Sequence, residues 1–371
     1  MSITGPAILD SLEGDIRVTL FLQGDSVERV DIASSRPQLA QRLLAGCTAR
    51  EAAERVGRVY SLCGRAQRLA AEAAAEAAAG VAVPADRLAR RERQVLADQA
   101  REHVWQLLMP TADRASAASD PTPLRLIAQA VEEEDALATT LTRVLTEHLL
   151  GEPPARWLSR DPEALRRWCA EAATAPAQRL AETLRDPDPA VGRTRLLPAL
   201  AAWRPDTIRS LARQALGEPG FCARPLWQGR PAETGLLSRL CDDPTLSAWI
   251  RGMDRGSAAR LLARLVELAR LPARLVGDGL PVVRAWSLGE GVGVAGVETS
   301  RGLLLHIVRL DAGRVTDYRI LAPTEWNFHP AGPLAEALAA MPPGAGLAER
   351  ARRVVASLDP CVACQVEIRH A

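Results

Sequence analysis

The spacing of apolar positions divides the chain into a short extended beginning, a long helical middle and a second extended region near the end. Residues 16–22 and 27–32 are apolar, β-branched runs around a Gly-Asp pair, which predicts a β-hairpin. From residue 37 to about residue 271, apolar residues recur at the three-and-four spacing of amphipathic helices. We expect helices at 38–44, 49–79, 85–108, 123–150, 161–174, 176–185, 194–216, 232–240 and 257–270.

The pattern changes near Pro281, where short β-branched runs separated by glycines replace the helical period. These runs predict strands, which helices then follow; the strands are at 282–286, 293–298, 302–310 and 314–321, and the helices at 333–340 and 347–358. The expected fold class is therefore α+β, with a mostly helical body and a small antiparallel sheet that joins the N- and C-terminal segments. We predict a single domain over 1–371, composed of N-terminal strands (1–36), a helical body (37–275) and a final segment of strands (280–371).

The composition excludes several classes of partner. Of the 371 residues, 47% are hydrophobic and 25% are charged, which is typical of a globular protein with ample core. The net charge is +1, so a nucleic-acid partner is not expected. All 46 basic residues are arginine, and they are scattered along the sequence. We interpret them as a compositional preference rather than as a phosphate site.

The distribution of apolar residues also bears on location. We find no run of about 18 apolar residues, so no membrane span is predicted. The first residues contain acids and a Gly-Pro pair instead of a basic segment followed by an apolar one, so a signal peptide is not expected. Seven cysteines are too few for a disulfide scaffold in a chain of this length, and their odd number would leave one unpaired. Free or metal-binding thiols in a reducing compartment fit this number better. The expected location is the cytoplasm.

Two of the cysteines form a C-x-x-C pair near the end of the chain. Cys361 and Cys364 can face one metal ion, because a turn brings their sulfur atoms to the same side, and thiolates favour iron, nickel and zinc. The spacing alone leaves a metal site, a redox pair and two structural thiols open. A redox pair would be expected in a βαβ context, and a four-cysteine zinc site would need a second C-x-x-C. The sequence provides neither.

The residues around this pair resemble the end of [NiFe]-hydrogenase large subunits, which carry Asp-Pro-Cys-x-x-Cys there, as Asp359 to Cys364 do. Further segments resemble other motifs of that family in the same order. Residues 12–18 resemble its opening strand, and 62–66 its N-terminal cysteine motif. Three later segments resemble further family motifs, at 291–293, 298–306 and 322–327. The resemblance covers roughly residues 10–65 and 285–370.

The resemblance implies a set of site residues. In the family, the matching cysteines hold the nickel–iron centre, so Cys63, Cys361 and Cys364 are the candidate metal ligands. The family's arginine over the metals and its hydroxyl residue that contacts a cyanide on the iron correspond to Arg301 and Thr324. A guanidinium and a hydroxyl can both donate hydrogen bonds to such a ligand. The glutamate that relays protons in the family corresponds to Glu13.

Several positions depart from the family pattern. Ala66 stands where the second N-terminal cysteine, which bridges the two metals, would be. Glu367 replaces the terminal histidine that helps to hold a magnesium ion in the family, and Gln41 replaces the glutamate that shares that ion. Ser300 replaces the proline before the arginine. The sequence continues for only seven residues after Cys364, so we expect no C-terminal extension that is cleaved after nickel insertion.

These departures are similar to those of the accessory proteins called HupK or HoxV. The resemblance implies a protein without catalytic activity that is a scaffold or carrier for iron with cyanide and carbon monoxide ligands, with no stable nickel. Hydrogenase maturation proteins and a client hydrogenase large subunit are the expected partners. Two alternatives stay open at this point. One is a metal-free folding platform, and the other is a working hydrogenase subunit, against which Ala66 argues.

The remaining motifs, cysteines and histidines give weaker indications of a functional site. Residues 291–296 formally match G-x-G-x-x-G, but they lead into an expected strand rather than a helix, so dinucleotide binding is not predicted. Four isolated cysteines are interpreted as structural, namely Cys47, Cys169, Cys222 and Cys241. Three histidines have no partner at ligand spacing and are assigned to the core or the surface, namely His103, His148 and His329. For His306 a satisfied strand histidine and a site residue are both open.

Overall fold

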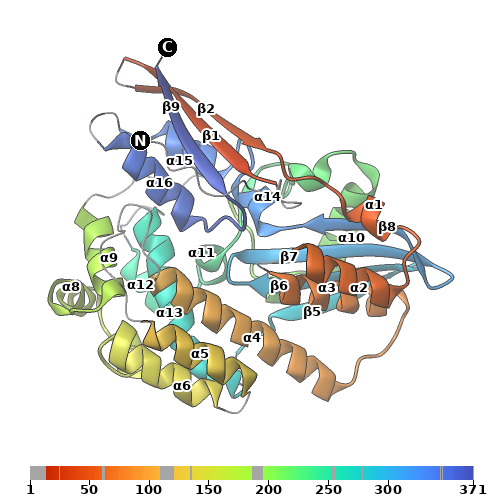
Figure 1. The fold of residues 1–371 in the computed structure, drawn as a ribbon, viewed down its shortest axis with the longest axis horizontal. Helices are drawn as coiled ribbons and strands as arrows, with labels where there is room; N and C mark the ends of the chain where they lie inside the picture. Colours follow the sequence, from red (N-terminus) through yellow and green to blue (C-terminus); the bar gives the residue numbers. More distant parts are fainter. Residues whose placement is uncertain are drawn as a thin grey trace.

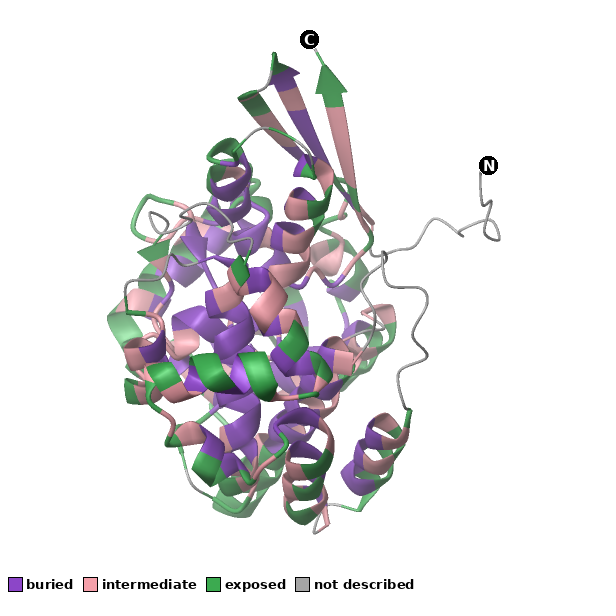
Figure 2. Ribbon diagram, turned by 90° about the vertical axis from the view of Figure 1, so that its left-hand side faces the viewer, coloured by how far each residue is buried: buried purple, intermediate pink, exposed green. Residues whose placement is uncertain are grey.

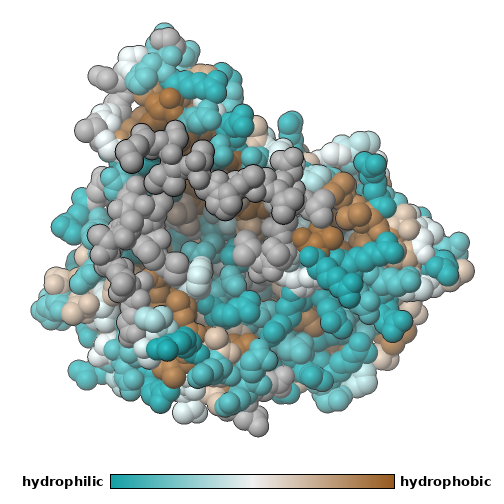
Figure 3. All heavy atoms as spheres, in the orientation of Figure 1, coloured by the Kyte–Doolittle hydropathy of each residue, from teal (hydrophilic) through white to brown (hydrophobic). Residues whose placement is uncertain are grey.

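The computed structural model describes residues 14–24, 26–60, 63–108, 121–133, 136–185, 195–251, 256–277, 279–342, 344 and 346–370. The described residues have the expected α+β fold, with a helical body on one side and three β-sheets, of which two have three or more strands and the third is the short parallel pair β3 (Arg195–Leu196) and β4 (Ala232–Glu233) (Figure 1). Figure 2 shows that buried residues concentrate along the central helices and on the strands that face them. On the face drawn in Figure 3, apolar side chains gather in separate patches over the terminal strands and around α1.

The first sheet joins the two ends of the chain. It has the order β2-β1-β9, with β1 at Ile16–Gln23, β2 at Ser26–Ser34 and β9 at Cys364–His370. The predicted hairpin is confirmed as an antiparallel pair, whereas β9 runs parallel to β1, with Ile16 opposite Cys364. The sheet is therefore mixed rather than wholly antiparallel, and the sequence reading missed β9. Its apolar alternation spans only a few residues, too few for a clear period of two.

The second sheet is an antiparallel meander, β5-β6-β7-β8. Its strands agree with the predicted ones to within a few residues and are Val283–Gly289, Val292–Thr299, Gly302–Asp311 and Arg314–Leu321. It does not join the sheet formed by the chain ends. Strands β6 and β7 are buried along most of their length, because α3 packs across them. At Gly293 the helix comes so close that a Cβ would collide with the backbone of Ala74.

The helical body surrounds α13 (Ser257–Leu275), which is buried on nearly every side. The helices that precede it run as follows: α1 Ala40–Leu44, α2 Ala49–Val59, α3 Gly64–Ala78, α4 Ala85–Leu108, α5 Thr122–Glu132, α6 Leu137–Val144, α7 Pro154–Leu158, α8 Pro162–Glu171, α9 Ala175–Arg185, α10 Pro205–Gly217, α11 Leu236–Arg239 and α12 Pro244–Trp249. After the second sheet come α14 (Pro323–Asn327), α15 (Pro333–Ala339) and α16 (Leu347–Ser357). A π-helical turn, η1 (Leu145–Leu149), continues α6.

Four predicted helices are wrong in part. The helix expected over 123–150 is two helices, α5 and α6, and the π-helical turn η1 follows α6. The helix expected over 49–79 is two helices, α2 and α3, which cross where Gly57 and Gly64 touch; a Cβ on Gly64 would collide with the Gly57 carbonyl. The helix expected over 194–216 begins only at Pro205, after β3 (Arg195–Leu196) and the 3-10 turn η2 (Leu200–Ala202). The segment 232–240 begins as β4 (Ala232–Glu233) before α11, and the further 3-10 turn η3 spans Phe221–Ala223.

Three apolar clusters stabilise the described part of the chain. The largest lies around α13, the second lies between the terminal sheet and helices α15 and α16, and the third lies between α10 and the four-stranded sheet. The single-domain organisation stays a prediction. Within the described residues, no helix combines the length and the apolar character needed to cross a membrane.

Candidate functional site

Cys361 lies in the turn between α16 and β9 and is 9% exposed. Two side chains from distant parts of the sequence contact its sulfur. The Thr324 hydroxyl, on the first turn of α14, is 3.1 Å from Sγ, and the Arg36 guanidinium, just after β2, donates to Sγ from 3.2 Å. Three separate segments therefore converge on this thiol.

Arg36 is fixed by a buried ion pair. Its Nε donates to Glu325 Oε1 at 2.8 Å, and both side chains are only 8% exposed. Burial alone would lower the pKa of Arg36, but the charges of Glu325 and Cys361 outweigh burial and raise it, so the guanidinium stays protonated. Tyr60 lies beside the pair. Burial, and then the charge of Glu325, raise the pKa of Tyr60 to about 12, with smaller contributions from Cys63 and Cys361.

Arg301 occupies the tight turn between β6 and β7. Its guanidinium is 3.0 Å from Glu102 Oε2 on α4 and 3.6 Å from Asp359 Oδ1. Burial would lower its pKa, but the charges of Asp359 and Glu102, followed by those of Cys361 and Cys63, raise it. Cys63 from the N-terminal part of the chain and Cys361 from the C-terminal part therefore both contribute to the raised pKa of Arg301.

Asp359 anchors the turn that carries Cys361. Its backbone has a φ of 51°, in the left-handed region that is uncommon for a residue with a side chain. Its carboxylate accepts hydrogen bonds from Gln106 of α4 at 2.7 Å and from Arg264 of α13 at 3.2 Å. Together with Arg301, these contacts hold the strained turn against the helical body.

Cys63 precedes α3 and lines a cavity of about 290 Å³. Its sulfur accepts a hydrogen bond from the Gln67 amide at 3.6 Å, one turn further along the helix. Ala66 lines the same cavity, as does Arg301, and further charged walls come from Asp98, Arg101 and Glu102. The thiol at this end is half-buried and borders open space.

A buried polar chain connects Cys63 to the second sheet. His306 Nε2 lies 2.8 Å from Gln67 Oε1, and Nδ1 lies 2.7 Å from the Tyr318 hydroxyl. Since the Gln67 oxygen accepts only, Nε2 carries the proton and Nδ1 accepts from Tyr318. Burial lowers the pKa of His306 to about 3, so the ring is neutral. His306 is therefore a satisfied strand histidine that orients Gln67.

Cys364 is the first residue of β9, opposite Ile16 of β1. It is half-buried at the edge of the apolar cluster beneath the terminal sheet. Burial, with a smaller contribution from Asp15, raises the pKa of its thiol to about 11.

Comparison with known proteins decides the family. The sequence model described as nickel-dependent hydrogenase matches residues 281–367. The hydrogenase expression/formation protein HoxV of Cupriavidus necator is 33% identical over 91% of this chain and 92% of its own length. The corresponding protein HupK of Azotobacter vinelandii is 33% identical over 97% of this chain and all of its own length. This chain belongs to the HupK/HoxV family of hydrogenase expression/formation proteins.

The solved structures agree with that assignment at the level of the fold. The Ni-Fe-Se hydrogenase of Desulfomicrobium baculatum superposes with a TM-score of 0.60, covering 92% of this chain and 95% of that one, at 14% identity. The fold of this HupK/HoxV protein is thus that of the hydrogenase large subunit. The family's name describes an accessory role in hydrogenase formation.

The structure brings some of the predicted site residues together. Thr324 touches Cys361, and Arg301 lies where the charges of Cys361 and Cys63 both act on it. Within the described ranges, no group of three or more His, Cys, Asp and Glu side chains is arranged to hold a metal ion. Joint ligation by Cys63, Cys361 and Cys364 therefore stays a prediction. Glu13 lies outside the described residues.

The two positions at which the family's magnesium ligands are replaced lie apart in this HupK/HoxV protein. Gln41 binds β8: its side-chain oxygen accepts from the Tyr318 amide at 2.6 Å and its amide donates to the Thr316 carbonyl at 3.1 Å. Glu367 lies on β9 and pairs with Arg369 at 2.9 Å. Gln41 therefore hydrogen-bonds to a neighbouring strand, and Glu367 forms an ion pair within its own strand.

Sequence reasoning missed the residues that complete the surroundings of Cys361. Arg36 and Glu325 had been assigned no role, although Glu325 follows Thr324 directly in a matched motif. Glu102, which pairs with Arg301, lies in the helical middle that matched no family motif. An isolated arginine after a strand gives no sequence signal, because its importance depends on a partner 289 positions away.

The other cysteines and histidines are placed mainly as expected. Cys47, Cys169 and Cys222 are buried, and burial raises the pKa of Cys169 to about 11 and that of Cys222 to about 12. His103 is fully buried on α4, and neither ring nitrogen has a hydrogen-bond partner among the described residues. Burial, with the charges of four neighbouring arginines, lowers its pKa well below the usual value.

Proposed function

We propose that this protein carries an iron fragment with cyanide and carbon monoxide ligands during hydrogenase maturation and passes it to a client large subunit. The observation that supports this most directly is the surroundings of Cys361. A buried thiol has a permanently charged guanidinium 3.2 Å from its sulfur and a hydroxyl at 3.1 Å. Thiolate is the form that binds metal, and a guanidinium and a hydroxyl can both donate hydrogen bonds to it.

The same donors suit the cargo. Cyanide bound to iron exposes a nitrogen that accepts hydrogen bonds, and guanidinium and hydroxyl groups are donors. Arg36 and Thr324 contact the Cys361 sulfur, and Arg301 lines the same cavity as Cys63. Under the proposal, these groups orient the diatomic ligands while the thiolates bind the iron.

The ligand set would have to assemble as the cargo binds. Cys361 is held in place, whereas Cys63 borders a cavity of about 290 Å³ and Cys364 begins an edge strand. A site that forms on loading can also open on release, which is what a carrier needs. Ala66 removes one bridging thiolate, so stable binding of nickel next to the iron is not expected.

The decisive experiment measures cargo on the purified protein. The protein would be purified without oxygen from cells that make the maturation machinery, and then assayed for iron, for nickel and for the infrared bands of cyanide and carbon monoxide. We expect about one iron with both bands and no nickel. Cys361→Ser and Cys364→Ser should lower iron occupancy by about 10-fold or more, since outer-shell changes alone typically cost about 10–100-fold. Cys241→Ser, outside every matched motif, is the control.

Second-site variants refine the result. Arg301→Leu should reduce retention of cyanide-bearing iron, and Arg301→Lys should restore part of it by returning the charge. Ala66→Cys should add a ligand, slow release and therefore increase iron on this protein while client hydrogenase activity falls. Normal client maturation with both Cys361→Ser and Cys364→Ser would refute the carrier mechanism and leave a metal-free folding platform in its place.

A further inference from the structure

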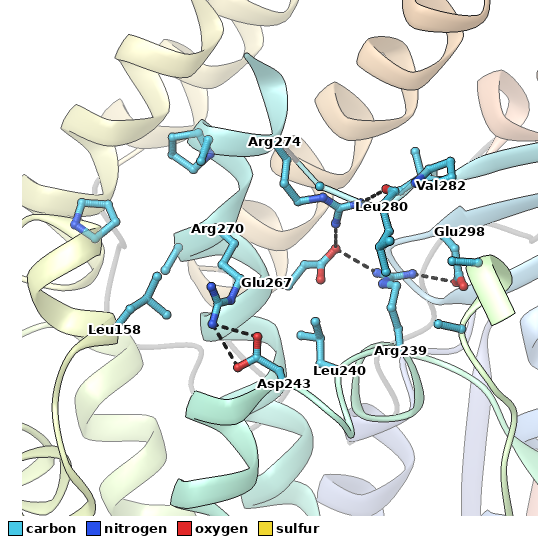
Figure 4. Close-up of a pocket in the computed structure, with 18 of the residues that line it drawn as sticks. Leu158, Arg239, Leu240, Asp243, Glu267, Arg270, Arg274, Leu280, Val282 and Glu298 are labelled. Atoms are coloured by element: carbon cyan, nitrogen blue, oxygen red, sulfur yellow. Dashed lines mark hydrogen bonds and ion pairs between the residues drawn. The ribbon is translucent and has the colours of Figure 1, made fainter. Parts of the chain in front are cut away.

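A second hollow lies away from all three candidate cysteines, between α7, α11, α13, η2 and the loop 279–282 (Figure 4). Its volume is about 590 Å³. Small-molecule sites typically enclose about 300–1,000 Å³, so this one is large enough for an organic ligand. Its walls are mainly apolar, and include Pro153, Pro154, Leu158, Leu240, Pro272 and Leu280.

Charged residues form one side of this cavity, and their charges cancel. Arg239 lies between two acids, 2.9 Å from Glu298 and 3.3 Å from Glu267, and Arg274 also pairs with Glu267 at 2.9 Å. The remaining pair is Arg270 with Asp243, at 2.8 Å. Three arginines thus face three carboxylates among the lining residues (Figure 4). An anion or a cation would meet an equal number of like charges, which favours an uncharged ligand.

Two of these arginines retain unused donors. The Nε groups of Arg239 and Arg270 are buried and have no hydrogen-bond partner among the described residues. Arg239 itself is almost completely buried, with a side chain 7% exposed. A buried donor left without an acceptor costs about 1–3 kcal/mol, so a ligand acceptor that reached either Nε group through a shift of the side chain on binding would recover that cost.

One apolar side chain in the cavity wall is largely exposed to solvent. Leu280, which lines the cavity, is 68% exposed, so a ligand seated against it would remove apolar surface from water. Four of the lining residues are prolines, each of which fixes the backbone φ at its own position.

We propose that this cavity binds a small, uncharged, mainly apolar molecule that carries a hydrogen-bond acceptor such as a carbonyl oxygen. The apolar walls bury its hydrocarbon part, and its oxygen accepts a hydrogen bond from an arginine N–H group. This site does not depend on the iron-carrier function, because Cys63, Cys361 and Cys364 are not among its lining residues.

The test uses Nile red, a neutral dye with a carbonyl group that fluoresces in apolar surroundings, and three competitors of similar shape. We expect 2-acetonaphthone, a ketone, to displace the dye about 5- to 10-fold better than the hydrocarbon 2-ethylnaphthalene, as one hydrogen bond of about 1 kcal/mol implies. The anion 2-naphthoate should compete less well than the ketone. A naphthoate that binds best, or a hydrocarbon that equals the ketone, would overturn the assignment.

Variants locate the binding. Ala155→Trp and Ala273→Trp put a bulky ring into the cavity from exposed wall positions and should weaken dye binding by about 10-fold or more. Ala128→Trp, equally exposed on α5 but outside the cavity, is the matched control. Equal binding by all three variants would disprove the site. Cys361→Ser should bind dye normally, so that a failure of the carrier mechanism leaves this result unaffected.

Arg270→Met tests the donor. The substitution keeps an apolar stem of similar length, and Asp243 retains its hydrogen bonds from the amides of Thr245 and Leu246. The preference for ketone over hydrocarbon should fall to about 2-fold or less, while hydrocarbon binding stays the same. If Arg270→Met prefers the ketone over the hydrocarbon as strongly as the wild type does, another group donates the hydrogen bond to the ketone oxygen. The role assigned to Arg270 would then be wrong.

Discussion

The surroundings of Cys361 and of Cys63 differ, although both thiols act on the guanidinium of Arg301. Cys361 is buried and is contacted by Arg36 and Thr324, and Arg36 is in turn locked by Glu325. Cys63 begins a helix, has Gln67 as its partner and borders a cavity of about 290 Å³. One thiol is enclosed by charge-paired groups, and the other faces open space.

This difference separates two tasks that a carrier must perform. An enclosed thiol with fixed donors retains a ligand, because the donors are already oriented when the ligand arrives. A half-buried thiol beside a cavity lets a ligand approach and leave. Under the proposed function, Cys361 would therefore hold the iron and Cys63 would be the exchangeable contact. If the surroundings of Cys361 and Cys63 differ as much as their contacts indicate, substitutions at the two ends should change stability by different amounts.

The largest effect is expected at the enclosed end. Arg36→Leu removes the guanidinium that pairs with Glu325, whose side chain is only 8% exposed. Breaking a buried ion pair from one side costs about 3–5 kcal/mol. We expect the free energy of unfolding, measured by urea denaturation at pH 7, to fall by about that amount.

The control is an exposed ion pair in the sheet that β1, β2 and β9 form. Arg17→Leu breaks a contact with Glu367 at 3.9 Å between side chains that are 56% and 37% exposed, and should cost less than about 1 kcal/mol. The double variant Arg36→Leu/Glu325→Leu should recover part of the lost stability. Equal losses for Arg36→Leu and Arg17→Leu would mean that the Cys361 end is no more tightly built than the surface.

A smaller effect, dependent on pH, is expected behind Cys63. His306 has a pKa of about 3 in the folded protein and about 6.5 when unfolded. Below pH 6.5 the unfolded chain therefore binds a proton that the folded chain does not. Stability contributed by the neutral ring is full above pH 6.5 and is lost as the pH falls towards 3. The slope is at most about 1.4 kcal/mol per pH unit, or about 2 kcal/mol between pH 6.5 and 5.

Comparing wild type with His306→Gln isolates this proton. The variant should lose stability less steeply over pH 6.5 to 5 in urea unfolding series. His103, whose pKa burial also lowers, is present in both proteins and adds the same slope to each. Identical pH slopes would show that His306 is not held neutral, and would remove its role in orienting Gln67 towards Cys63.

Much of the fold was predictable because its signals are local. The helix over 85–108 and the four strands from 282 to 321 were found from their own periods of 3.6 and 2, and the structure confirms them. The break between α2 and α3 was missed because it depends on contact between Gly57 and Gly64, which only the folded backbone shows. Strand β9 was missed because a short edge strand depends on β1 for its definition.

The candidate site was predictable only where a motif carried it. Thr324 and Cys361 belong to matched segments, and the structure places them 3.1 Å apart. Arg36 and Glu102 belong to no motif, and each acquires its role from a partner about 200 or more positions away, namely Glu325 and Arg301. Pairing over such distances is a property of the fold, and a single sequence contains no local pattern that records it.

The smallest effect should come from adding a thiol at the open end. Ala66 is 6% exposed but lines the cavity beside Cys63, whereas Ala70, one turn further along α3, is fully buried and does not line it. Ala66→Cys can place its sulfur in existing space, so the free energy of unfolding should change by less than about 0.5 kcal/mol. Ala70→Cys adds the same atom to a packed interior and should cost about 1–3 kcal/mol. Urea denaturation of both variants under reducing conditions gives the comparison.

If the free energy of unfolding falls as much for Ala66→Cys as for Ala70→Cys, the space beside Cys63 is not available to a ligand. The contrast between the two thiols would then rest on the contacts of Cys361 with Arg36 and Thr324 alone.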